Sequence, residues 1–265
     1  MRRFTAIVNP AAGRAAGAAA LIPLARALRG AGAQVEAEYS RGFAHAAALA
    51  GRAAASGRTV LAVGGDGMAG TVAGALAGTD AVCGLVPGAV GQGAVARALG
   101  LPRASEELAE LLLGGEPRPV DVLRVTGPEE PAAWALGAVW AGAGAARTAP
   151  GRALASRRSA LFRITVDDAV HERRGHTAVV ANAPCLDGGS AGDSAAGVRL
   201  DDGALDVVVL GGGPGRRTRT RGEALRGRRV RVEADRPLAY AADGIPAPAL
   251  PLTAEVLPAA LRLLR

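Results

Sequence analysis

The sequence contains no lysine, so all 31 of its strongly basic side chains are arginine. A P-loop nucleotide site, a protein-kinase active site and Schiff-base catalysis each need a lysine, and all three are excluded. Cysteine is scarce as well: Cys83 and Cys185 cannot form a disulfide framework, which favours a reducing cytoplasm. No unbroken apolar run approaches the roughly 18–20 residues that a membrane-spanning helix requires.

Aromatic residues make up only 3% of the 265 residues, which suffice for one large domain or two ordinary ones. The net charge of +7 favours an anionic partner, such as a nucleotide, an anionic lipid or a nucleic acid. Nine arginines lie between Gly215 and Arg236, but no stacking aromatic or recognisable module accompanies them, which argues against nucleic acid. An anionic surface at the inner face of the membrane is the more natural partner, and a merely solvated surface is the alternative.

Up to residue 119, short apolar runs alternate with helical patterns. The expected strands are FTAIV (4–8), VEAEYS (35–40), TVLAV (59–63) and VCGLV (82–86), and Ser105 is expected to cap a later helix. Apolar strands that alternate with helices predict a doubly wound parallel sheet, which binds ligands outside the carboxyl ends of its strands. Residues 1–119 are therefore expected to form an α/β domain.

Residues 120–265 show a different pattern, with many strand-like segments and few helical ones. These segments are DVLRV, WALGAVWA, FRITVDDAV, HTAVVANA, ALDVVVL, RRVRVEAD and LTAEVL, several of them joined by Gly, Asp or Pro turns. This part is expected to be a mainly β domain. Whether the last residues return to the first domain stays open.

Three glycine-containing loops follow expected strands of the first domain. They are NPAAG (9–13), GGDG (64–67) and PGAVGQG (87–93), and in a doubly wound sheet all three open at the same edge. Glycines let the backbone approach a phosphate closely, so the three loops predict a nucleotide cleft. A G-x-G-x-x-A pattern at 91–96 follows the fourth strand rather than the first, which argues against NAD(P)-dependent redox chemistry.

The motifs VNPAAG, VGGDG, ARALGLP, VRLDDGALDVVVL and ADGIP occur in this order over nearly the whole chain. Together they resemble the diacylglycerol kinase catalytic-domain family, which includes bacterial lipid kinases and is related to sphingosine kinases and, more distantly, to NAD kinases. The resemblance implies an α/β nucleotide-binding domain and an antiparallel β-sandwich substrate domain, between which ATP and substrate meet. It also implies Mg2+-dependent transfer of the ATP γ-phosphoryl group to a hydroxyl of a lipid or other apolar small molecule. Backbone amides cradle the phosphates in this family, so no lysine is needed.

The resemblance also assigns residues to the site. The nucleotide site is expected to comprise Asn9, Pro10, Gly13, Ser40, Gly64, Gly65, Asp66, Gly67 and Gly91. A structural Mg2+ is expected at the Asp202 carboxylate, aided by the carbonyls of Arg199 and Ala204. Asp243 matches the aspartate of the family's Asp-Gly-Glu motif and is the expected catalytic base, and a homodimer is left open.

Several positions depart from the family pattern. Met68 replaces a threonine, Ala12 replaces a serine, and the AVGQGAV loop lacks the usual Thr, Asn and Asp. Ile245 replaces the glutamate of the Asp-Gly-Glu motif, and an isoleucine cannot accept a proton. The first hypothesis is an ATP-dependent kinase for a lipid or other apolar molecule, including a secondary metabolite. The alternative is a catalytically inactive nucleotide- or ligand-binding pseudokinase with a regulatory role.

Overall fold

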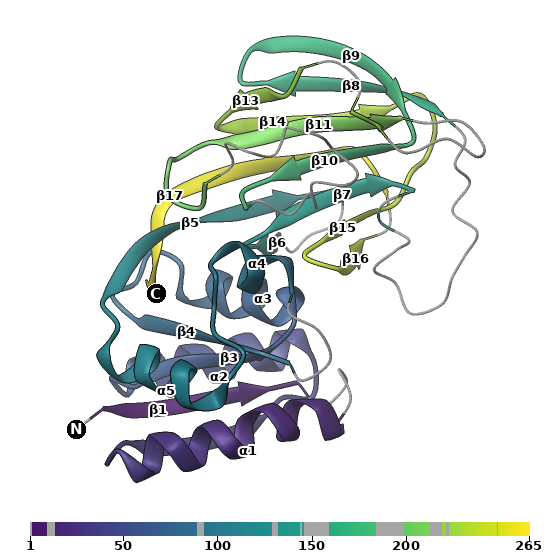
Figure 1. Cartoon of the computed structure of the whole chain (residues 1–265). Helices are drawn as coiled ribbons and strands as arrows, with labels where there is room; N and C mark the ends of the chain where they lie inside the picture. Colours follow the sequence, from purple (N-terminus) through teal and green to yellow (C-terminus); the bar gives the residue numbers. More distant parts are fainter. Residues whose placement is uncertain are drawn as a thin grey trace. The chain divides into compact units, whose positions relative to one another are not determined.

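The chain forms two compact units (Figure 1). Unit 1 comprises Met1–Val122 and Ala259–Arg265, and unit 2 comprises Leu123–Pro258. A helix-flanked parallel sheet in unit 1 and an antiparallel β-sandwich in unit 2 confirm the predicted fold class. The computed structural model describes residues 2–9, 14–88, 93–128, 132–143, 145, 159–183, 199–211, 219–220, 223–247 and 249–265.

Four parallel strands build the sheet of unit 1, in the order β2-β1-β3-β4. They are β1 (Arg3–Val8), β2 (Gln34–Tyr39), β3 (Thr59–Gly64) and β4 (Val82–Pro87). The interior strands are continuously apolar because helices cover both faces of a parallel sheet. The end of β17 (Leu252–Leu264) adds a further parallel strand, in which Arg262 pairs with Val82 of β4.

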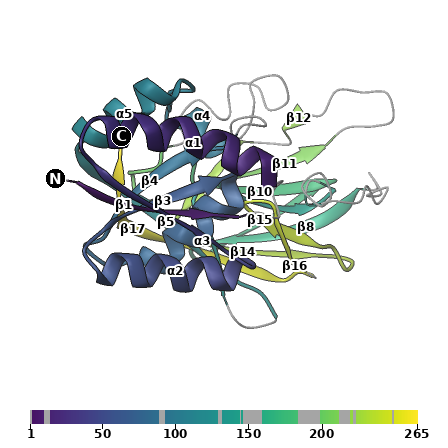
Figure 2. The same cartoon turned by 90° about the horizontal axis from the view of Figure 1, so that it is seen from below.

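Helices lie on both faces of this sheet. Figure 2 shows α1 and α5 on one face and α2 on the other, and α3 packs against α2. The helices are α1 (Arg14–Gly30), α2 (Phe43–Ala55), α3 (Asp66–Leu76), α4 (Ala94–Ala98) and α5 (Ser105–Gly114). The expected cap at Ser105 is wrong, because Ser105 is already helical and Ala104 precedes the helix without a side-chain cap. Glu106 and Glu107 stabilise this end through the helix dipole instead.

Unit 2 consists of two packed sheets. One holds the last part of β5 (Pro117–Thr126), β6 (Ala133–Ala135), β8 (Ala160–Val166), β9 (Ala169–Gly175), β14 (Arg229–Ala234) and the first part of β17. The other has the order β12-β11-β10-β7-β15-β16, with β13 beside β11. Its strands are β7 (Ala138–Gly142), β10 (Thr177–Ala181), β11 (Leu205–Gly211), β12 (Arg219–Thr220), β13 (Leu225–Gly227), β15 (Tyr240–Ala242) and β16 (Ile245–Ala247).

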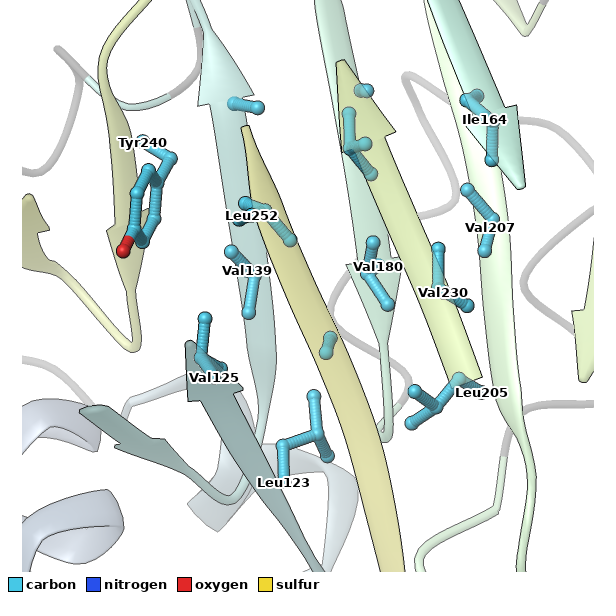
Figure 3. Close-up of a cluster of buried hydrophobic side chains, with 14 of the residues drawn as sticks. Leu123, Val125, Val139, Ile164, Val180, Leu205, Val207, Val230, Tyr240 and Leu252 are labelled. Carbon is cyan, nitrogen blue, oxygen red and sulfur yellow. The ribbon is translucent and has the colours of Figure 1, made fainter. Parts of the chain in front are cut away.

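The inner faces of these two sheets form the core of unit 2 (Figure 3). Leu123, Ile164 and Val230 from one sheet pack with Val180 and Val207 from the other, and all five are almost completely buried. Along β8 buried residues alternate with more exposed ones, which is the period of two expected for a sheet with one covered face.

Two of the predicted strands of unit 2 are divided. WALGAVWA breaks at Leu136 and Gly137 into β6 and β7, because the backbone there turns to donate hydrogen bonds to a buried aspartate. FRITVDDAV breaks at Asp167, whose φ of 51° begins the turn between β8 and β9. Within the described ranges, no helix is long and apolar enough to cross a membrane.

Candidate active site

The GGDG loop joins β3 to α3 at the carboxyl edge of the unit 1 sheet. Gly64 has a φ of 151°, a conformation that side-chain-bearing residues rarely adopt, and Gly65 is extended at φ −91° and ψ −171°. No side chain caps the first turn of α3, and the first amides of a helix have no acceptor within it. A Cβ added to Gly65 would meet no atom of the described residues within 4 Å. The loop therefore combines N–H donors with open space, which is what a phosphate group requires.

Met68 stands where the family motif usually has a threonine. Its side chain is 3% exposed, and its Cβ lies 3.2 Å from the position of a Cβ on Gly64. Met68 thus packs beneath the loop as part of the core. It presents no hydroxyl to a ligand above the loop.

The carboxylate of Asp66 ties the GGDG loop to the segment that follows β4. Its Oδ2 accepts a hydrogen bond from the Ala94 amide at 2.8 Å, and its Oδ1 accepts one from the Val95 amide at 3.1 Å. Gly93 permits this approach, because a Cβ there would lie 2.1 Å from Oδ1. The Gly88 amide also donates to the carbonyl of Gly64 at 3.3 Å. Two of the three predicted loop regions consequently lie side by side.

Ser40 and Asn9 lie after the two neighbouring strands β2 and β1. The Ser40 amide donates to the Val8 carbonyl at 2.9 Å, which holds Ser40 beside the end of β1, and Asn9 follows directly. Ser40 is 1% exposed, and its Oγ makes no hydrogen bond with the described part of the chain. A buried hydroxyl of this kind suits a polar ligand group that reaches the loop edge. The other expected nucleotide ligands, Pro10, Gly13 and Gly91, lie outside the described residues.

Asp243, the expected base, is held in the interior of unit 2. Its carboxylate accepts hydrogen bonds from the amides of Leu136 (2.6 Å), Gly137 (3.1 Å to each oxygen) and Ala138 (2.8 Å). The residue is 9% exposed, and its φ of 46° places it with Gly244 in the Asp-Gly turn between β15 and β16. These contacts make Asp243 an anchor for the backbone between β6 and β7.

Asn182 also binds the backbone of Leu136 and Gly137, through their carbonyls, and the sequence did not predict this role. It follows β10, is fully buried, and donates from Nδ2 to the Leu136 carbonyl at 2.9 Å. Its amide donates to the carbonyl of Gly137 at 2.8 Å. The only available signal was an asparagine directly after an apolar strand, and that pattern is common in ordinary turns.

Ile245, which replaces the motif's glutamate, begins β16. It pairs with Ala242 of β15 and is half-buried. The glutamate position of the motif therefore presents an alkyl side chain that can neither accept a proton nor bind a cation.

The residues expected to hold a structural Mg2+ make contacts of a different kind. Asp202 Oδ2 lies 2.5 Å from an Arg226 guanidinium nitrogen, and its Oδ1 accepts a hydrogen bond from the Ala204 amide at 3.2 Å. The guanidinium of Arg199 pairs with the Asp201 carboxylate at 3.0 Å. The negative charges of Asp201 and Asp202 raise the pKa of Arg199. No cluster of three or more His, Cys, Asp or Glu side chains suited to a metal occurs among the described residues.

Two family models match the chain, one in each half. The diacylglycerol kinase catalytic domain matches residues 3–125. The YegS C-terminal NAD kinase beta sandwich-like domain matches residues 142–222 and 215–265. No curated protein matches the chain in sequence.

Solved structures share the fold. The crystal structure of a diacylglycerol kinase from Bacillus anthracis str. Sterne has a TM-score of 0.70 and 18% identity over 99% of this chain and 96% of that chain. A second structure from that organism, assigned to the same class provisionally, has a TM-score of 0.71 and 17% identity over the same shares. Because the two family models together span both units, in the order that the motifs predict, the chain belongs to the diacylglycerol kinase catalytic-domain family, which is of lipid kinase type.

Proposed function

We propose that this protein is an ATP-dependent kinase that transfers the γ-phosphoryl group to a hydroxyl of a lipid or other apolar small molecule. The observation that carries the proposal is the open glycine loop at the start of α3. A Cβ on Gly65 would have no neighbour within 4 Å in the described part of the chain, and no side chain caps the helix that follows. Membership of a kinase family supplies the reaction type.

Phosphate binding at this loop does not depend on lysine. The Met68 amide already donates to the Gly65 carbonyl, so the amides of Asp66 and Gly67 and the positive end of the helix dipole are what attract a phosphate at α3, which is 11 residues long. The buried Ser40 Oγ can bond a second polar group of the nucleotide. Phosphoryl transfer depends mainly on positioning and on neutralising charge, which amides and arginines supply as well as lysine does.

Asp66 is the residue that would hold a divalent cation accompanying ATP. Each of its carboxylate oxygens accepts one amide hydrogen bond, so each keeps a lone pair for a further contact. The bound cation would neutralise phosphate charge during transfer. Because Asp66 is itself held by Ala94 and Val95, it is oriented before any ligand arrives.

Asp243 remains the candidate base, since Ile245 cannot serve. To accept a proton from the substrate hydroxyl, its carboxylate would have to exchange at least one of its three amide partners for that hydroxyl. The transition state of phosphoryl transfer is loose in most analyses, and the proton can leave late. Loss of a dedicated base is thus compatible with activity, whereas loss of the phosphate site is not.

Peripheral binding to an anionic membrane fits an apolar acceptor. Arg163, Arg174, Arg229 and Arg231 are exposed on β8, β9 and β14, and Val170 on β9 is 51% exposed. The guanidinium group of arginine can donate two parallel hydrogen bonds to a lipid phosphate, and its electrostatic attraction to the membrane weakens as the salt concentration rises. Cosedimentation with vesicles containing phosphatidylglycerol should exceed that with neutral phosphatidylcholine vesicles at low salt, and equal binding to both would contradict this part of the proposal.

A transfer screen tests the proposed activity. The full chain is incubated with γ-labelled ATP, MgCl2, a total lipid extract and a panel of apolar alcohols, and label is counted in the organic phase. We expect label in at least one acceptor from the wild type and from Gly51→Val, a control on α2 where a Cβ also meets nothing within 4 Å. Gly65→Val, which fills the loop, should give none. Absence of label in every acceptor, although ATP binds, would overturn the kinase proposal.

The second candidate is a pseudokinase that binds a nucleotide or another ligand without transferring phosphate. It is favoured by the buried Met68 and by Ile245, which together remove the threonine hydroxyl and the glutamate of the family's motifs. Calorimetric titration separates the cases. MgATP binding without transfer supports the pseudokinase, and no ATP binding at all leaves a scaffold with another ligand.

A further inference from the structure

Arg226 connects three segments of unit 2 at one end of the β11–β13 pair. It lies on β13 directly opposite Asp206 of β11. One guanidinium nitrogen lies 2.8 Å from Asp206 Oδ2, and the other lies 2.5 Å from Asp202 Oδ2 in the turn that precedes β11. A single side chain therefore bridges two carboxylates.

The two carboxylates that Arg226 bridges are largely shielded from water. The Asp202 and Asp206 side chains are 19% and 13% exposed, whereas the side chain of Arg226 is 43% exposed. Burial raises the pKa of the Asp206 carboxyl, and the neighbouring Arg226 opposes that rise. Two carboxylates this close together need a cation between them, and the arginine provides it.

A magnesium ion does not fit this arrangement. Mg2+ demands six oxygens in near-octahedral geometry. Here Asp202 Oδ2 is held by the guanidinium and Oδ1 by the Ala204 amide, so an ion would have to share both oxygens with donors that are already in place. It would also lie within a few ångströms of a fixed positive charge, which repels it.

We propose that Arg226 replaces a structural divalent cation in this protein, so that unit 2 is stable without metal. The guanidinium holds the Asp202 carboxylate, the group to which the family resemblance assigned a structural Mg2+, and it thereby ties the Asp202–Ala204 turn to β13. This inference does not rest on the proposed kinase activity, because it concerns the folding of unit 2.

Thermal unfolding of the full chain in millimolar MgCl2 and in EDTA tests the proposal. The wild type should unfold at the same temperature in both buffers. Arg226→Met should lower Tm by about 2–4 °C in EDTA, and MgCl2 or CaCl2 should restore part of the loss, because the two carboxylates are left without a cation. Arg226→Lys should fall between these, since an ammonium cannot form the two-pronged bridge.

Two further variants keep the test decisive. Arg231→Met removes an exposed arginine that pairs with Glu233 at 3.0 Å, and it should change Tm little and confer no response to metal. Asp202→Asn should lower Tm equally in both buffers. The proposal is overturned if Mg2+ stabilises the wild type and Asp202→Asn abolishes that stabilisation, because a metal would then be bound at Asp202. Dependence on Asp202 separates this outcome from Mg2+ bound at Asp66.

Discussion

In unit 1 the carboxylate of Asp66 accepts two amide hydrogen bonds at the open edge of the sheet, whereas in unit 2 that of Asp243 accepts hydrogen bonds from three amides and is 9% exposed. Asp202, the other motif aspartate of unit 2, is likewise satisfied by the chain itself, through Arg226 and the Ala204 amide. The motif positions of unit 1 keep donors and space for a ligand. Those of unit 2 are used to build the fold.

This difference indicates where activity can survive sequence change. Phosphate binding at the GGDG loop uses backbone amides, which a side-chain substitution such as Met68 does not remove. Proton transfer and metal binding use particular side chains, and there Ile245 and Arg226 have altered the chemistry. We therefore expect ATP recognition to be retained in unit 1, and unit 2 to be independent of metal.

Asp243→Asn is expected to have the largest effect, because it tests whether this aspartate of unit 2 stabilises the fold. Asparagine tolerates the positive φ of this position, so the substitution removes the charge while the turn is kept. Its NH2 group would face amide donors, and we expect a loss of about 3 kcal/mol or more in the free energy of unfolding. Urea denaturation measures this loss. If Asp243 serves mainly as a base, stability stays near the wild-type value while kcat falls by about 10²–10⁴.

Gly93→Ala tests the link between the two loop regions of unit 1. The new Cβ would lie 2.1 Å from Asp66 Oδ1, so the carboxylate must leave its amides, at a cost of about 1–3 kcal/mol. In the double variant with Asp66→Ala the clash disappears, and Gly93→Ala should then cost little. A cycle of urea unfolding measures this coupling. Simple additivity of the two losses would show that the carboxylate is not held as described.

The pH dependence of Arg226→Met probes the bridge in unit 2. Burial raises the pKa of the Asp206 carboxyl, and the nearby positive charge of Arg226 lowers it. Removing the arginine therefore raises this pKa further. A raised carboxyl pKa contributes stability below the unfolded value and loses it as pH rises through the folded value. The variant should therefore lose about 1 kcal/mol at pH 7 and progressively less towards pH 4. A loss that is constant over this range would show that the two charges do not interact.

Gly65→Val should have the smallest effect on stability and a clear effect on binding. Its backbone is extended and a Cβ there has no described neighbour within 4 Å, so the fold should lose no more than about 1 kcal/mol. The side chain occupies the approach to the loop, and MgATP affinity should fall by more than about tenfold, which calorimetry can measure. The matched control Gly51→Val should bind as the wild type does. Undiminished affinity in Gly65→Val would place the nucleotide elsewhere.

Much of the fold could be predicted because it follows from local pattern. The apolar runs of β1, β3 and β4 match the predicted strands closely, since a strand buried on both faces needs a continuous apolar segment. The interruptions inside WALGAVWA and FRITVDDAV were missed. They depend on the partners of Leu136–Ala138 and on the turn at Asp167, which are remote contacts that no local pattern records.

The candidate site was less accessible to sequence reasoning. The glycine loops could be found because glycine at a strand end has a direct conformational meaning, as Gly64 shows. The partners of Asp202 and Asp243 could not, because Arg226 lies 24 residues from Asp202 and Leu136 lies 107 residues from Asp243. A sequence motif identifies the aspartate, but it does not show whether the partner of its carboxylate is a ligand, a metal ion or another part of the chain.

The fate of the γ-phosphoryl group tests the central claim most directly. Phosphorus NMR of a reaction containing the wild type, MgATP and the acceptor-containing lipid fraction distinguishes transfer from hydrolysis. We expect ADP and a new phosphate monoester to appear together with the wild type, and neither to appear with Gly65→Val. Unchanged ATP, or release of inorganic phosphate alone, would contradict the assignment of this protein as a kinase.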